Sequence, residues 1–244
     1  MQAVILAAGI SSRMLPLTKD VPKPMLLLAG KPVMEHVIKK LQYAGITEII
    51  ITVHYLPYVI KDYFGDGSGH GVQISYAYEP KRMDTAGSLK RITHLLDDSF
   101  LVCGGHFYLP QIDFDALFNA HYANDGLLTI VFKVLDDPSL LPFFGQGILA
   151  ETGRLINFHE KPQQQISRLV HTTYQVFRRD ALDIIPEGMP VSIPDFVIPE
   201  LLRLKMPIYG YITESELLNV SNYQLYERAQ QLMIKATKAH KENV

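Results

Sequence analysis

The sequence has one cysteine, Cys103, in 244 residues. A chain with a single cysteine cannot form an internal disulfide, and this usage is typical of a protein of the reducing cytoplasm. No apolar run approaches the roughly 18 residues that a membrane-spanning helix needs. No basic segment precedes the first apolar stretch, so we expect neither a membrane span nor a signal peptide.

The sequence also has no large excess of positive or negative residues. The chain has 23 Lys and Arg against 25 Asp and Glu, a formal net charge of −2. This balance gives no electrostatic reason to expect binding to nucleic acid or to a membrane surface. Internal repeats and low-complexity blocks are also absent. With 48% hydrophobic and 20% charged residues, the chain is neither disordered nor fibrous, and its length suits one large α/β domain.

Short apolar runs alternate with helical patterns along the chain. The sequence predicts a buried strand at Gln2–Leu6, a helix over residues 33–45, a strand at Glu48–Val53 and a helix at Pro57–Phe64. The alternation continues into the second half. This order predicts a doubly wound, mostly parallel (mixed) α/β sheet with its first strand in a central position.

A turn of small residues follows the first predicted strand, and basic residues come next. Small residues let the backbone approach a ligand closely where the strand ends. Such a turn beside converging cations suits a nucleoside triphosphate, because backbone N–H groups, arginine and lysine all bind phosphate oxygens. The predicted phosphate-binding residues are Leu6, Ala7, Ala8, Gly9, Ser11, Ser12, Arg13 and Lys23.

The spacing of this segment is long and specific. From Gly9 to Leu26 it reads G-x-x-x-R-x-x-P-L-T-x-x-x-P-K-P-M-L, which resembles the sugar-phosphate nucleotidyltransferases, or NDP-sugar pyrophosphorylases. The resemblance implies the nucleotide-diphospho-sugar transferase variant of the Rossmann-like fold. It also implies that an NTP and a sugar 1-phosphate react to give NDP-sugar and pyrophosphate. Two cations take catalytic roles by this resemblance: Arg13 binds the triphosphate, and Lys23 neutralises charge around the reacting phosphates.

The resemblance extends to about residue 229. The stretch Phe158-His159-Glu160-Lys161-Pro162 resembles a family element in which the glutamate holds sugar hydroxyls and the lysine holds the sugar phosphate. His171 falls near the sugar pocket by the same resemblance. A buried, hydrogen-bonded structural histidine accounts for His171 equally well.

The implied organisation is a single nucleotidyltransferase domain over residues 1–244. Residues 1–110 form the nucleotide-binding half, and residues 111–229 form the sugar-phosphate-binding half. A helical tail covers residues 230–244. A helical pattern already begins at Tyr223, before this tail, and continues into it. We expect the chain to be frayed and solvated from Lys235 onward.

Departures from the family occur where the resemblance places the base. Asp84 replaces a glycine that lies against the nucleotide, where a carboxylate would repel phosphate, and Thr85 and Gly105 are further implied nucleotide contacts. Glu79 falls near a glutamine that reads the base in thymidylyltransferases. Its carboxylate would accept hydrogen bonds from guanine or cytosine. A solvated residue at the end of a strand is an equal alternative for Glu79.

The expected metal site departs most from the family. Relatives carry N-G-D and W-x-D-I-G-T elements whose aspartates bind the catalytic Mg²⁺, and the aligned stretches here read GGH at 104–106 and LLNVSN at 217–222. His106 and Asn219 therefore replace both carboxylates. Mg²⁺ prefers carboxylate and phosphate oxygens, and histidine suits Mn²⁺ or Zn²⁺ better. These two residues predict a weak metal site at most.

Three functions stay open from the sequence. The first is an active nucleotidyltransferase in which NTP phosphates and water supply most of the Mg²⁺ ligands, or in which Mn²⁺ replaces it. The second is a catalytically impaired homologue that binds a nucleotide or nucleotide-sugar as a regulatory or assembly subunit. The third is cytidylyl transfer to a non-sugar phosphate. Intact Arg13, Lys23 and Lys161 favour the first, which we adopt, for a cytoplasmic protein with homo-oligomerisation left open.

Overall fold

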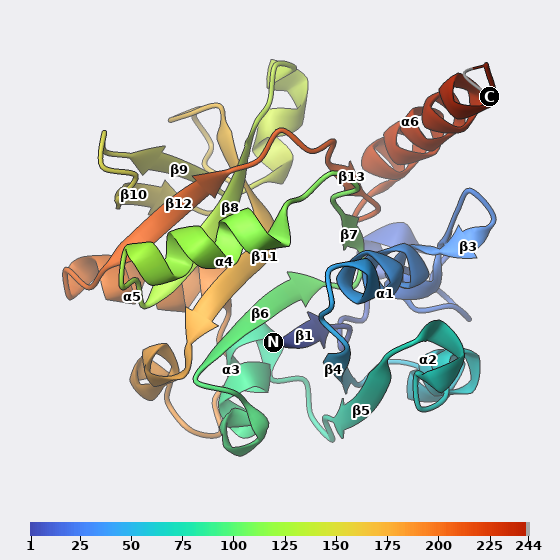
Figure 1. Ribbon diagram of the computed structural model, residues 1–244, viewed down its shortest axis with the longest axis horizontal. Helices are drawn as coiled ribbons and strands as arrows, with labels where there is room; N and C mark the ends of the chain where they lie inside the picture. Colours follow the sequence, from blue (N-terminus) through green and yellow to red (C-terminus); the bar gives the residue numbers. More distant parts are fainter. Residues whose placement is uncertain (243–244) are drawn as a thin grey trace.

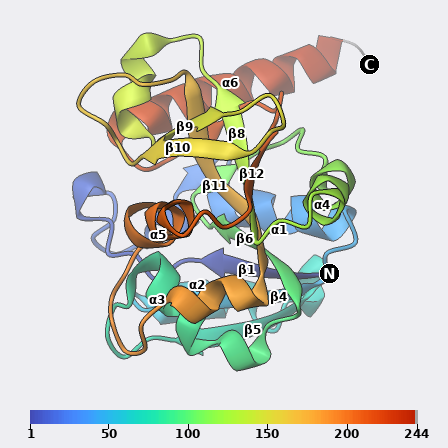
Figure 2. The ribbon, with the colours of Figure 1, turned by 90° about the vertical axis from the view of Figure 1, so that its left-hand side faces the viewer.

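The computed structural model describes residues 1–242, with side chains placed through residue 236. A mixed sheet runs through the molecule, and helices cover both of its faces (Figures 1 and 2). In the described part of the chain, nine strands belong to this sheet, and their order is β10-β9-β11-β6-β1-β4-β5, with β8 pairing with β11 and β12.

Strand β1 (Gln2–Leu6) lies in the interior of the sheet. It runs parallel to β4 (Glu48–Val53) on one side and to β6 (Ser99–Gly104) on the other. Its residues 3–5 are fully buried, as a central strand covered on both faces requires. The prediction of a central N-terminal strand in a mixed, mostly parallel sheet is confirmed.

The two halves of the sheet differ in direction. From β6 through β1 and β4 to β5 every pairing is parallel, whereas the long strand β11 pairs antiparallel with β6, β8 and β9. Beyond it, β12 runs parallel to β8, and β10 runs antiparallel to β9. These strands span the following residues: β5 (Gln73–Tyr78), β8 (Leu128–Val134), β9 (Gln146–Leu149), β10 (Leu155–His159), β11 (Leu169–Arg178) and β12 (Ile208–Ile212).

Helices divide between the two faces of the sheet. Successive side chains of a strand point to opposite faces, and Ala3 and Ile5 of β1 pack in one apolar cluster while Val4 packs in another. Residues of α1, α2 and α4 belong to the first cluster, and residues of α3 and α5 to the second. The helices are α1 (Val33–Tyr43), α2 (Pro57–Phe64), α3 (Asp84–Arg91), α4 (Phe114–Ala123), α5 (Ile198–Arg203) and α6 (Tyr223–Glu242).

Helix α6 projects away from the sheet at its C-terminal end (Figure 1). Its first turns pack against Met14, Leu26 and Leu28, on the segment that carries the phosphate motif. The predicted helix start at Tyr223 is confirmed. The predicted fraying from Lys235 is wrong for the backbone, which stays helical through Glu242, and residues 243–244 lie outside the described part.

Two short two-stranded ladders lie beside the main sheet. One joins β2 (Leu27–Leu28) to β3 (Lys31–Pro32), and the other joins β7 (Phe107–Tyr108) to β13 (Leu218–Asn219). Among the described helices, none combines the length and the apolar composition that crossing a bilayer requires.

Candidate active site

A cavity of about 520 Å³ opens where β1, β4 and β6 end, and residues Leu6, Thr52 and Gly104 at those strand ends line it. Ligands of open α/β sheets bind at the carboxyl ends of parallel strands, and this volume is that of a small-molecule site. The cavity is also lined by most of the residues that the sequence predicts, namely Ala7, Ala8, Gly9, Ser11, Arg13, Lys23, Asp84, Thr85, His106, Glu160, Lys161, His171 and Asn219.

The turn after β1 is held by backbone contacts. The N–H of Ala7 donates to the carbonyl of Thr52 at 3.1 Å, and the buried hydroxyl of Thr18 donates to the carbonyl of Ser11 at 3.0 Å. Ser11 adopts a left-handed conformation with φ of 60°, which a residue other than glycine keeps only when its surroundings hold it. Nothing lies within 4 Å of a Cβ added at Gly9, so this turn leaves open space in front of it.

Lys23 is the most unusual charge in the cavity. It begins a short 3₁₀ helix, Lys23–Met25, and only 8% of its surface is exposed. No ion-pair partner exists for Lys23 or for Arg13 among residues 1–236. Burial, followed by the positive charges of Arg13 and Lys161, lowers the pKa of Lys23 to about 8. Three cations therefore lie close enough to influence one another, and two of them, Lys23 and Arg13, have no counter-ion within the described residues.

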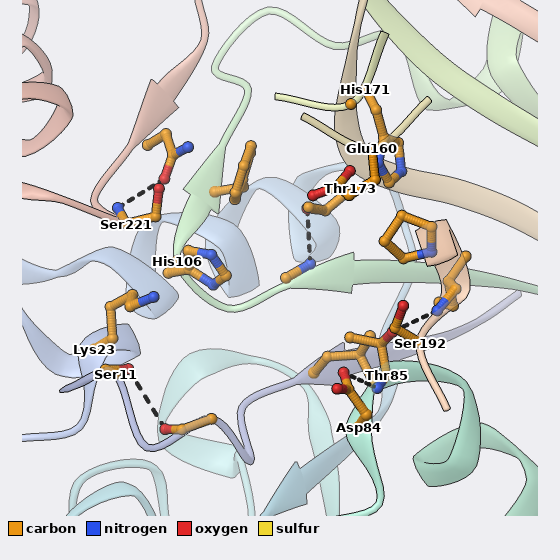
Figure 3. A pocket seen from close by; sticks show the side chains of 18 of the residues that line it. Ser11, Lys23, Asp84, Thr85, His106, Glu160, His171, Thr173, Ser192 and Ser221 are labelled. Carbon is orange, nitrogen blue, oxygen red and sulfur yellow. Dashed lines mark hydrogen bonds between the residues drawn. The ribbon is translucent and has the colours of Figure 1, made fainter. Parts of the chain in front are cut away.

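His106 lines the same cavity, on the side of Lys23 (Figure 3). Burial lowers its pKa well below the ordinary range, and the charges of Lys23, Arg13 and Lys161 lower it further. The imidazole is therefore neutral near pH 7. A Cβ on Gly104 would come within 3.3 Å of this ring and 3.0 Å of the Thr173 hydroxyl, so glycine at this strand end leaves room for both.

Asn219 lies next to His106, because β13 pairs with β7 and Asn219 opposes Phe107. The structure thus brings together the two residues that replace the expected metal-binding aspartates. The Oδ1 atom of Asn219 accepts a hydrogen bond from the N–H of Ser221 at 2.8 Å (Figure 3). Its Nδ2 atom is buried and has no hydrogen-bond partner. The orientation of the amide follows from the Ser221 N–H, which requires an acceptor.

The opposite wall of the cavity is formed by the turn after β10 and by β11. Lys161 has a left-handed backbone with φ of 43°, and its ammonium pairs with the carboxylate of Glu160. His171 is 6% exposed, with an unpaired buried Nε2, so the alternative of a hydrogen-bonded structural histidine does not describe this ring nitrogen. Burial and then the charge of Lys161 lower its pKa to about 3.

The Asp84 carboxylate, which we expected to repel phosphate, has a positively charged partner. Its φ of 58° is left-handed, and its carboxylate accepts from the Arg82 guanidinium at 3.1 Å and from the Thr85 N–H at 2.8 Å. Arg82 lines the cavity as well. The expected repulsion of phosphate by Asp84 is therefore offset by the neighbouring arginine.

Three predicted residues do not line the cavity: Ser12, Glu79 and Gly105. Glu79 is 2% exposed, and its carboxylate accepts from the Met83 N–H at 3.2 Å, so the alternative of a solvated residue is wrong. A Cβ on Gly105 would lie 3.2 Å from the side chains of Ile5, Met34 and Pro24. This glycine therefore serves packing behind the cavity wall.

Sequence reasoning missed Gln175 and Thr173 of β11, which line the cavity. Gln175 is 2% exposed, and its Oε1 atom has no hydrogen-bond partner. Thr173 has a φ of 69° and accepts from the Gly104 N–H at 3.2 Å. Polar residues at alternate positions of an otherwise apolar strand were the signal that could have identified them.

Comparison with known proteins identifies the family of the chain. A family model described as Nucleotidyl transferase matches residues 2–195. The chain belongs to the nucleotidyl transferase family. A "UTP--glucose-1-phosphate uridylyltransferase" of Synechocystis is 30% identical over 243 residues, covering 94% of this chain and 62% of that protein. A "Mannose-1-phosphate guanylyltransferase" of Mycobacterium tuberculosis is 34% identical over 87% of this chain and 59% of that protein.

A solved structure confirms the fold. It is described as a putative glucose-1-phosphate thymidylyltransferase from Bacillus anthracis and superimposes with a TM-score of 0.84, at 22% identity, over 96% of this chain and 95% of that one. The chain spans about three fifths of the length of the two relatives above.

Members of this family generally depend on a divalent metal, and the residues here do not fit one. Among the described side chains, no group of three or more His, Cys, Asp or Glu residues is placed to hold a metal ion. The oxygen of Asn219 is already hydrogen-bonded to Ser221, and His106 offers a nitrogen among three cations. Mg²⁺ takes oxygen ligands in near-octahedral geometry, which this pair of side chains does not supply.

Proposed function

We propose that this chain binds a nucleoside triphosphate and a sugar 1-phosphate in one pocket, and that it transfers the nucleotidyl group to the sugar phosphate. One observation carries the proposal. The turn after β1, with Arg13 and Lys23, lines the same cavity as the Glu160–Lys161 turn, although about 140 residues separate them in sequence. The names of the relatives support it, because they are uridylyl-, guanylyl- and thymidylyltransferases.

We assign the two walls of the cavity to the two substrates. The phosphate end consists of the turn Leu6–Gly9 with Ser11, Arg13, Lys23, His106 and Asn219. The sugar end consists of Glu160, Lys161, His171 and Gln175. This division assigns residues 1–110 to the nucleotide and residues 111–229 to the sugar phosphate, except that Asn219 reaches the phosphate end.

The reaction follows from this placement. An oxygen of the sugar phosphate attacks the α-phosphorus of the NTP, a new O–P bond forms, and the bond to the pyrophosphate oxygen breaks. Lys161 holds the attacking phosphate, and Arg13 and Lys23 stabilise the charge that the leaving pyrophosphate carries. Lys23 is buried, and a preorganised charge in a buried position contributes more than the same charge in solution.

A second function has an observation in its favour. Because His106 and Asn219 do not supply carboxylates, a catalytically impaired homologue would keep the same pocket and hold a nucleotide or nucleotide-sugar as a regulatory or assembly subunit. A measurement of pyrophosphate release separates the two functions. UTP, GTP and dTTP are each combined with glucose 1-phosphate and mannose 1-phosphate, with Mg²⁺, Mn²⁺ or EDTA, and the Lys23→Met variant serves as the blank.

Release above this blank with at least one pair supports the transferase. Binding of a nucleotide or NDP-sugar without release favours the impaired homologue. If no nucleoside phosphate binds under any condition, both proposals are wrong.

We further propose a cytoplasmic location, because the single cysteine, Cys103, is buried and free. A net charge of −2 supports small anionic ligands held by local cations over nucleic acid or membrane partners. Homo-oligomerisation, which the sequence leaves open, is tested by light scattering of the purified chain.

A further inference from the structure

The phosphate end of the cavity has no free carboxylate. Three carboxylates line the cavity, and each has a partner: Asp84 pairs with Arg82, Glu160 pairs with Lys161, and Asp195 accepts from the Ser192 hydroxyl at 2.6 Å. Arg13 and Lys23 have no such partner within the described residues. This end therefore presents positive charge that a bound anion, and not a cation, would balance.

Asn219 adds a hydrogen-bond donor to these charges. Its residue is 2% exposed, its Oδ1 is engaged by the Ser221 N–H, and its Nδ2 lacks any partner. A buried N–H group without an acceptor is costly in a folded protein. An amide nitrogen cannot ligate a metal ion, whereas a phosphate oxygen would satisfy it. The atom facing the ligand is thus a donor, at a position where the sequence resemblance led us to expect an acceptor.

We infer that this pocket binds the phosphate groups of its ligand directly, through Lys23, Arg13 and the Nδ2 atom of Asn219, without a bridging divalent cation. The inference rests on the proposed function, since it concerns how the nucleoside phosphate of that reaction is held. The form that binds is the metal-free polyphosphate anion. Mg²⁺ then lowers binding, because it complexes the polyphosphate in solution and its charge is repelled by Lys23 and Arg13.

Calorimetric titration of the unmodified chain with UTP, GTP and inorganic pyrophosphate tests the inference, once in excess EDTA and once in excess Mg²⁺. We expect the affinity in EDTA to exceed the affinity in Mg²⁺. Binding that is about tenfold or more tighter with Mg²⁺ would overturn the inference and leave the proposed function standing. Absence of binding in both buffers overturns both.

Asn219→Asp tests the amide directly. Aspartate has the same shape and keeps an acceptor for the Ser221 N–H, so the fold is retained while the Nδ2 donor becomes a negative oxygen. We expect its affinity for pyrophosphate in EDTA to fall by about tenfold or more. An unchanged affinity would show that Asn219 does not contact the ligand and would overturn its role.

Asn222→Asp is the matched control. Asn222 lines the same cavity, and its Oδ1 accepts from the Leu225 N–H at 2.9 Å, which aspartate can also do. This variant adds the same charge to the cavity without removing an orphaned buried donor. We expect its affinity for pyrophosphate in EDTA to fall by less than that of Asn219→Asp. Equal losses would assign the effect to charge alone and overturn the direct contact.

Discussion

The phosphate end and the sugar end of the pocket treat charge in opposite ways. At the phosphate end, Lys23 is buried without a counter-ion. At the sugar end, Lys161 is paired with Glu160, and the orphaned atoms belong to the neutral side chains of His171 and Gln175. Unbalanced charge attracts an anion, whereas neutral donors and acceptors match sugar hydroxyls. The phosphate end therefore lacks an anion, and the sugar end lacks neutral hydrogen-bonding partners. This difference supports the proposed assignment of the two ends.

The largest expected effect comes from Lys23→Met, which keeps the length of the side chain and removes its charge. NTP affinity should fall by about 1.5–3 kcal/mol, while the free energy of unfolding stays equal or rises, because an unpaired buried charge is lost. Calorimetry and urea unfolding measure the two quantities. Lys19→Met, at an exposed position of the same segment, is the control. Unchanged NTP affinity at low salt would contradict the assignment.

Acid should destabilise the fold through its histidines of lowered pKa: His106 at the phosphate end, one at the sugar end and one outside the pocket. The folded pKa is about 3 for His171 and about 4 for His121, which contacts the Thr129 hydroxyl at 2.8 Å. Both values lie below the ordinary 6.5, so the neutral forms stabilise the fold above pH 6.5, and this stability is lost as pH falls. Between pH 6.5 and about pH 5, His171 and His121 should each lower the free energy of unfolding by on the order of 2 kcal/mol.

Urea unfolding at neutral pH and at about pH 5 measures this loss. His121→Gln and His171→Gln should each reduce the difference in the free energy of unfolding between the two pH values. Only the His171 variant should also weaken binding of a sugar 1-phosphate. If both variants keep the full acid sensitivity, the burial argument is wrong.

Gln175→Leu should separate stability from binding at the sugar end. Removing a buried acceptor without a partner should raise the free energy of unfolding by about 1 kcal/mol, and the KM for the sugar 1-phosphate should rise while nucleotide affinity stays constant. Gln146→Leu is the control, because the Oε1 of Gln146 accepts from the N–H groups of Ile166 and Ser167 at 3.0 and 3.1 Å. That variant should be destabilised. A less stable Gln175→Leu protein would refute the prediction.

The smallest expected effect is that of Arg82→Met. Its partner Asp84 would then face the pocket uncompensated and repel phosphate. Both side chains are partly exposed, so NTP affinity should fall by less than about 1 kcal/mol. A titration at low and high salt measures it, and the loss should shrink at high salt. A gain in affinity would show that Arg82 does not offset Asp84.

Local patterns predicted the parallel half of the fold well. The strand at Glu48–Val53 and the helix at Pro57–Phe64 have the predicted bounds, because apolar periodicity and a proline at the helix start are encoded locally. The antiparallel half was missed in detail. Strand β11 pairs with β6, β8 and β9, and such pairings join residues far apart in sequence, so no local pattern specifies them.

The candidate site likewise has a part that local sequence predicted and a part that depends on residues distant in sequence. Its N-terminal turn could be predicted because strand, small residues and cations follow one another in sequence. The positions of His106 and Asn219 came only from the resemblance, and the β7–β13 ladder, which pairs Asn219 with Phe107, brings them near one another. The orientation of the Asn219 amide is set by a neighbouring backbone N–H, and the sequence carries no signal for that. Glu79 was placed near the base, yet its side chain is buried outside the cavity.

Helix α6 closes the segment around Lys23 by bonds to residues on either side of it. The hydroxyl of Tyr223 donates to the Leu15 carbonyl at 2.9 Å, and that of Tyr226 donates to the Leu27 carbonyl at 2.7 Å. These bonds join positions 208 and 199 residues apart, and closing loops of that length costs conformational entropy of the chain. Tyr223 and Tyr226 thus make the position of the segment that carries Lys23 depend on a helix about 200 residues further along the chain.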